Sequence, residues 1–183
     1  MERKLNQLSL DELYSIAVML DYDDLLNFCL SDDRFNNVIC NRDTFWQYKL
    51  NTDFPDYKKR IMKPTTKETY EYLHNLVNII KSIVSDFYIL LSTHDKYETA
   101  LKIITKIKSL EKYGYLFDES LLKPYLTNYH SNTNKDLNDV HIIFMFSHIL
   151  DNSDNKFNVY GRPIYSIKQF LSDRGIYNII NLL

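Results

Sequence analysis

The longest helical pattern in this chain lies between Thr66 and Ser92, where neither glycine nor proline interrupts the sequence. Apolar residues recur there at intervals of three and four, and this spacing places them on one face of an α-helix. The residues on that face are Tyr70, Leu73, Val77, Ile80, Val84, Phe87 and Leu91. The pattern therefore predicts one long amphipathic helix from Thr66 to about Ser92.

The same spacing continues into a second predicted helix, from His94 or Asp95 to about Tyr113, with Gly114 as its C-terminal stop. Its buried face would comprise Ala100, Ile103, Ile104, Ile107 and Leu110. The chain has only 3 glycines and 4 prolines in 183 residues, whereas a turn-rich β-sandwich usually recruits such residues at each chain reversal. The expected fold class is all-α.

Four short helices are predicted in the N-terminal region, between about Leu8 and Phe54. The apolar stripe of the first comprises Leu13, Ile16, Ala17 and Leu20. Asp23 is expected to cap the second helix, and Ser31 or Asp32 the third. The apolar residues of the third and fourth helices are Phe35, Val38, Ile39, Phe45, Trp46, Tyr48 and Leu50. Such a unit is too small to bury much surface alone, so it needs the rest of the chain or a partner.

The best position for a domain boundary lies between Pro55 and Pro64, because the residue before a proline is disfavoured in a helix. We therefore expect an N-terminal short-helix module over residues 1–57 and a C-terminal helical bundle over residues 58–183. Further helices in the bundle are predicted over residues 118–126, 139–150, 166–173 and 176–183.

Charge and hydropathy exclude several classes of function. The formal net charge of −2 argues against nucleic-acid binding, which depends on a basic surface. No uncharged apolar run reaches the roughly 18 residues needed to cross a bilayer, so no membrane span is expected. The cysteines Cys29 and Cys40 lie among apolar residues, and the simplest interpretation is a reduced compartment. We expect a soluble protein of the cytoplasm or the nucleus.

Nothing in the sequence predicts an active site or a cofactor. Glycine-rich phosphate loops and the common hydrolase motifs do not occur. His141 and His148 could share a helix face, but the spacing offers no third metal ligand. The segment 151–156 resembles a calcium loop, yet Lys156 and Arg162 replace the required glycine and glutamate. Helix capping accounts for most of the acidic cluster Asp21, Asp23, Asp24, Asp32 and Asp33. The chain is expected not to be an enzyme.

The spaced residues of the N-terminal region form a pattern of their own. It runs Leu8-Ser-Leu-Asp-Glu-Leu13, Ile16, Leu20-Asp-Tyr-Asp-Asp-Leu-Leu26, Phe28-Cys-Leu30, Arg34-Phe35, Val38-Ile39 and Phe45-Trp46. This pattern resembles the F-box family, and its residues are especially similar to those of F-box-like proteins of large amoeba-infecting DNA viruses. For a viral chain, the expected cytoplasm would be that of the host. Ser9 stands where the family usually has proline.

The resemblance implies an adaptor that docks a Skp1-type subunit of a ubiquitin ligase, while the remaining helices hold a protein target. The implied docking residues are Leu8, Ser9, Leu10, Leu13, Ile16, Leu20, Leu25, Leu26, Phe28 and Trp46. Two alternatives stay open. The same residues could form the core of the module, and the chain could be a structural or virion-associated helical protein that self-associates without Skp1, for which its many tyrosines and phenylalanines would be suited.

Overall fold

The computed structural model describes residues 7–94, 96–116, 149–150 and 166–176. Every regular element in these ranges is a helix, which confirms the all-α fold class. By internal packing the chain divides into two compact units, Met1–His74 and Asn75–Leu183. The division falls inside the long helix α5, so the first unit includes the opening turns of that helix. The helices predicted over 118–126, 139–150 and 176–183 lie wholly or largely outside the described residues.

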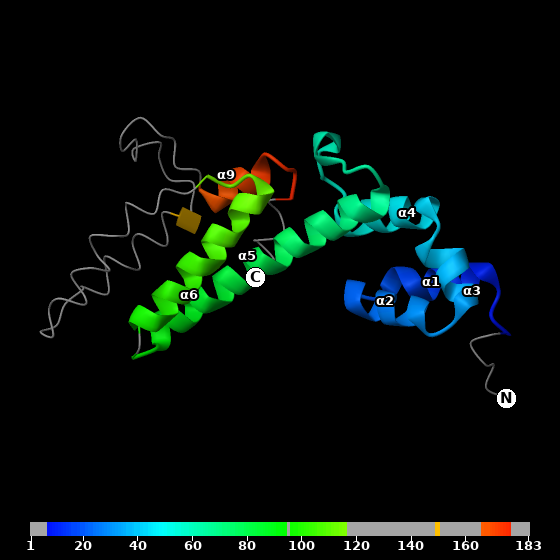
Figure 1. Cartoon of the computed structure of the whole chain (residues 1–183), viewed down its shortest axis with the longest axis horizontal. Coiled ribbons are helices and arrows are strands. Elements are labelled where there is room, and N and C mark those ends of the chain that lie inside the picture. Colours follow the sequence, from blue (N-terminus) through cyan, green and yellow to red (C-terminus); the bar gives the residue numbers. More distant parts are fainter. Residues whose placement is uncertain (1–6, 95, 117–148, 151–165, 177–183) are drawn as a thin grey trace, which may run out of the picture. The chain divides into compact units, whose positions relative to one another are not determined.

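The first unit is a set of short helices, drawn in blue to cyan in Figure 1. Its elements are α1 (Leu10–Met19), α2 (Tyr22–Leu30), α3 (Asp33–Phe35), the π-helix η2 (Asn36–Cys40), α4 (Asp43–Asp53), the 3-10 helix η3 (Lys59–Ile61) and the start of α5 (Thr66–Ser92). These bounds confirm the four short helical segments predicted from the sequence. The third differs in kind, since it continues from a single α-turn into a π-helix.

Polar side chains fix where the helices of this unit begin. Asp21, not Asp23, caps α2: its carboxylate accepts from the backbone N–H of Asp24 at 2.9 Å. The prediction at Asp23 was wrong because the chain enters the helix two residues earlier. Asp32 caps α3, as one of the two predicted alternatives. An N-cap of this kind satisfies backbone donors that have no partner within the helix.

Large apolar side chains of the first unit meet in one core. Its fully or almost fully buried residues are Leu13, Ala17, Leu25, Phe35, Ile39, Phe45, Trp46, Leu50, Tyr70 and Leu73. Aromatic rings contribute much of the contact: the ring of Phe45 meets Tyr14 edge-on at 5.4 Å between centroids, and Trp46 meets Tyr70 at 5.4 Å. The core therefore joins α1, α4 and the start of α5.

The second unit is built on the later part of α5 and on α6 (Lys96–Ser109), which lie side by side in Figure 1. The predicted stripe of α6, from Ala100 to Leu110, is buried. The 3-10 helix η4 (Leu110–Tyr113) continues α6 and ends at Gly114, whose φ of 86° confirms the predicted stop. The last described helix is α9 (Ile167–Ser172), and its Phe170 ring meets that of Tyr115 at 5.2 Å between centroids. Arg174, just after α9, donates to the carbonyl of Tyr113 in η4 at 2.7 Å.

Candidate functional site

Three of the ten predicted docking residues belong to the core of the first unit. Leu13 and Leu25 are 0% exposed, and Trp46 is 1% exposed. A partner cannot reach these side chains in this conformation, so they support the fold and not a contact surface. Their burial agrees with the core alternative for these three positions. Helical spacing alone cannot separate an inward residue from one a turn away that lies at the edge of the same stripe.

The other predicted docking residues lie at or near the surface. Ser9 and Leu10 are exposed, and the side chains of Leu8, Ile16, Leu20, Leu26 and Phe28 are partly buried. Among them Phe28 is partly covered by its own chain, because its ring stacks on that of Phe35 at 4.5 Å between centroids. This set, unlike the three core residues, is accessible to a partner.

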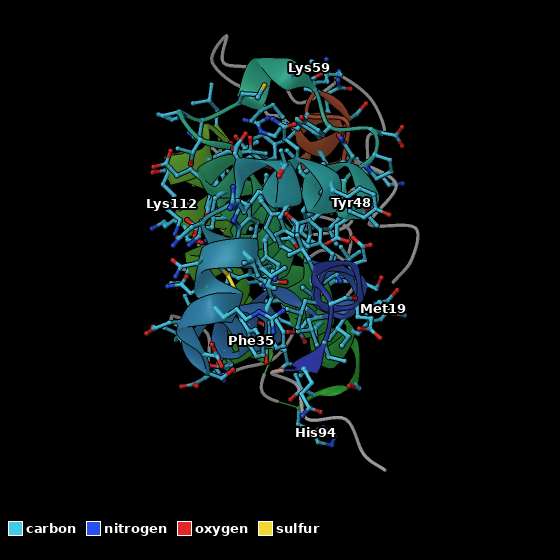
Figure 2. The ribbon with its side chains drawn as sticks, turned by 90° about the vertical axis from the view of Figure 1, so that its right-hand side faces the viewer. Met19, Phe35, Tyr48, Lys59, His94 and Lys112 are labelled. Carbon is cyan, nitrogen blue, oxygen red and sulfur yellow. A yellow bond between two sulfur atoms is a disulfide. The ribbon has the colours of Figure 1, made fainter. Side chains whose placement is uncertain are left out.

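The most exposed large apolar residues of α1 and α2 were not predicted as docking residues. Met19, labelled in Figure 2, is 88% exposed, and Leu30 is 82% exposed. Met19 follows Ile16 by three positions and Leu30 follows Leu26 by four, so each continues a stripe that the sequence already contains. We call the set formed by Ile16, Met19, Leu20, Leu26 and Leu30 the outer stripe.

Ser9 has a local role at the start of α1. Its hydroxyl accepts from the N–H of Glu12 at 3.3 Å, and its own N–H donates to the Glu12 carboxylate at 2.7 Å. This reciprocal pair is a capping box. Ser9 therefore fixes the beginning of the helix by hydrogen bonds, and it holds the exposed Leu10 at the first helical position.

Arg34 ties the segment before α1 to the rest of the unit. Its guanidinium donates to the carbonyl oxygen of Leu8 at 2.7 Å, across 26 residues of sequence. The adjacent Phe35 is buried in the core. The Arg-Phe pair of the predicted pattern thus places one side chain in the interior and uses the other to position Leu8.

A polar network that the sequence did not indicate lies beside the outer stripe. Lys49 is only 2% exposed, and its ammonium donates to the Asp53 carboxylate at 2.8 Å and to the carbonyl of Val18 at 3.1 Å. The Tyr70 hydroxyl donates to the same carboxylate. Burial, followed by the contacts with Asp53, raises the pKa of Tyr70 above its ordinary value. The network links the last turn of α1 with α4 and α5.

His74 packs against two aromatic rings that also contact each other: its ring centroid lies 4.8 Å from that of Tyr22 and 6.1 Å from that of Tyr70, and the two tyrosine centroids are 5.7 Å apart. Burial lowers the pKa of His74, while the carboxylates of Asp21, Asp23 and Asp53 oppose that shift and the ammonium of Lys49 reinforces it. Since neutral imidazole is favoured in the folded chain, this group contributes its full stability above a pH of about 6.5. That contribution decreases as the pH falls below this value, because the unfolded chain binds the proton more readily.

His74→Phe is therefore expected to flatten the loss of thermal stability between about pH 7.5 and pH 5. Phenylalanine keeps an aromatic ring in contact with the two tyrosines and removes the titrating group. The measurement is the melting temperature by circular dichroism as a function of pH, with His94→Phe, a change at an exposed histidine, as the control. Parallel pH profiles for wild type and His74→Phe would contradict this assignment.

The described residues contain no group of three or more metal-ligating side chains. No helix within them is long and apolar enough to cross a membrane. A shallow groove of about 500 Å³ in the second unit is lined by Asn75, Asn78, Ile79, Ser82, Lys106, Ser109, Lys112 and Tyr113. The Lys106 ammonium there donates to Ser82 and is paired with the Asp86 carboxylate, so its charge is already neutralised. His141, His148 and the segment 151–156 lie outside the described residues.

The two cysteines depart from the expectation of reduced thiols. Cys29 of α2 and Cys40 of η2 form a disulfide, drawn in yellow in Figure 2. Packing of α2 against η2 brings their Cα atoms to 6.2 Å, within the range that a disulfide can span. Sequence alone gave no reason to pair two cysteines that lie 11 residues apart, since their separation in space depends on how the third helix folds back.

The chain was compared with protein-family models, with curated proteins and with solved structures. None of them matches it. The candidate site thus consists of exposed or partly exposed apolar residues on α1, its C-cap and α2, which also contribute Leu13, Ala17 and Leu25 to the buried core.

Proposed function

We propose that the chain is an F-box-like adaptor whose first unit docks a Skp1-type ubiquitin-ligase subunit, while the later helices hold a protein target. The adaptor catalyses nothing itself, because the transfer chemistry belongs to other ligase subunits. The outer stripe is the docking surface. The proposal rests on the spaced F-box pattern and, above all, on the exposure of Met19 and Leu30.

The physical support is a surplus of apolar surface on small helices. α1 and α2 already fill the core with Leu13, Ala17 and Leu25, yet large apolar side chains remain in water on their other sides. Covering a side chain such as Met19 or Leu30 contributes about 1.5 to 3 kcal/mol. Exposed large apolar side chains are typical of protein–protein contacts. The exposed Asp23 and Asp24 at the start of α2 favour a partner that carries basic groups.

Met19→Asp is expected to weaken binding of a purified Skp1-type protein to the full chain by roughly 30-fold or more, the effect of losing about 2 kcal/mol at an interface anchor. A charge at this position would have to be buried without a partner on docking. The measurement is the dissociation constant by isothermal titration calorimetry, with circular dichroism to show that the variant keeps its helix content.

Met62→Asp provides the matched control, since it makes the same change at an exposed methionine of the first unit outside α1 and α2. It should bind like the wild type. Absence of binding by the wild-type chain, or equal loss from both methionine variants, would remove the docking proposal.

One observation favours a second function, a structural or virion-associated protein that self-associates. The Cys29–Cys40 disulfide is of a kind that persists in oxidising surroundings such as the surface of a virion and is rare in the cytosol. Light scattering of the purified chain across concentration tests this alternative. A stable oligomer without any Skp1-type protein supports it, whereas a monomer at all concentrations excludes it.

A further inference from the structure

The Cys29–Cys40 disulfide connects α2 to η2 within the first unit. Cys29 is the second-last residue of α2, next to the exposed Leu30, and Cys40 is the last residue of η2. Both cysteine side chains are buried. The bond therefore joins the end of α2 that carries part of the outer stripe to the segment that leads into α4.

Cys40 is itself held in place by a second contact. Its carbonyl oxygen accepts from Nε1 of the buried Trp46 at 2.8 Å. The segment that ends at Cys40 is less regular than its neighbours: η2 is a π-helix, a rare form that occurs mostly as single turns and frequently at functional sites. Through Cys40, the disulfide fixes α2 to a point anchored on the core.

We propose that the oxidation state of Cys29 and Cys40 controls how well the end of α2 is ordered, and thereby how tightly the outer stripe binds its partner. This inference rests on the proposed docking function. With the bond closed, α2 and η2 are held together and Leu26 and Leu30 are presented in one arrangement. With the bond open, only non-covalent packing holds them, and the partner must order that end of the helix on binding.

The redox step is a thiol–disulfide exchange with a low-molecular-weight disulfide such as oxidised glutathione. One cysteine loses its proton, and its thiolate attacks a sulfur of the glutathione disulfide, which releases one glutathione thiolate. The second cysteine thiolate then attacks the resulting mixed disulfide and releases the second glutathione. The two cysteines lose two electrons and two protons, and one glutathione disulfide becomes two glutathione molecules. Because both sulfurs are buried, each exchange requires a local opening of α2 or η2.

The first test is amide hydrogen exchange of the full chain, oxidised with glutathione disulfide or reduced with dithiothreitol, with the thiol state read from the mass after alkylation. Reduction should accelerate exchange over residues 22–40 on the order of tenfold. The double variant Cys29→Ser/Cys40→Ser is the control, since its exchange should resemble that of the reduced chain and should not respond to dithiothreitol. Equal exchange in the oxidised and reduced wild type would overturn the proposal.

The second test measures the dissociation constant for a purified Skp1-type protein in both states. The oxidised chain should bind about fivefold or more tightly than the reduced chain, because less of the helix has to be ordered on binding. Equal dissociation constants would overturn the redox control and leave the docking function standing. Absence of binding by both forms would overturn the docking function and the affinity claim together, and the exchange experiment would then decide the effect on α2 alone.

Discussion

Leu13→Ala is expected to lower the free energy of unfolding by about 2 to 5 kcal/mol, the usual range for truncating a buried leucine. Leu13 has no exposed surface, and it lies on the inner side of α1 together with Ala17. Truncation removes apolar contacts and leaves a cavity that the surrounding helices can fill only in part. Urea denaturation followed by circular dichroism measures the change.

Leu30→Ala is the matched control for this experiment, because it makes the same chemical change on the neighbouring helix at a position that is 82% exposed. It should alter the free energy of unfolding by no more than about 0.5 kcal/mol. If the two variants were equally destabilised, the division between core and outer stripe would be wrong. Leu30→Ala also provides a second test of the proposed docking surface, since it should weaken partner binding while keeping the fold.

Asp53→Ala is expected to destabilise the chain by about 3 kcal/mol, the lower end of the range for removing one partner of a buried ion pair. The change leaves the ammonium of Lys49 without a counter-ion and the Tyr70 hydroxyl without an acceptor. The lower end applies because the Asp53 side chain keeps 29% exposure, so water can replace part of what is lost. The measurement is again the free energy of unfolding in urea.

Replacing both members of the pair distinguishes a lost interaction from a lost volume. Lys49→Met combined with Asp53→Leu should recover most of the stability, since apolar residues of similar size remove the unpaired charge. Asp53→Asn, which keeps an acceptor oxygen, should fall between Asp53→Ala and the wild type. A double variant that is less stable than Asp53→Ala would contradict a buried-charge origin of the effect.

Helical periodicity was sufficient to predict the all-α class and the main helices among the described residues. It placed α5 at Thr66–Ser92 and the buried face of α6 correctly, because a long amphipathic helix repeats the same signal over many turns. The stop at Gly114 was predictable as well, since glycine readily adopts the positive φ that it has there. The start of α2 was missed by two residues because several aspartates in a row can each act as a cap.

The details of the candidate site were harder to predict, since they depend on contacts between distant residues. Periodicity selected Leu13 and Ile16 together, although the first is buried and the second is partly exposed. Burial of Lys49 had no local signal, because its partner at Val18 lies 31 residues away. The π-helical turn and the disulfide likewise arise from how η2 packs against α2. Met19 could have been predicted from the sequence, since it lies three residues after Ile16 and so falls on the same helix face.

The hydrogen bond from Lys49 to Val18 has a consequence for recognition. The carbonyl of Val18 is one of the last four of α1, for which the helix itself supplies no regular N–H donor. Such a final turn commonly frays, yet here an interior ammonium holds it one residue before Met19. If a partner docks on the outer stripe as proposed, this hydrogen bond already restrains the backbone next to Met19, so less main-chain freedom is lost when the complex forms.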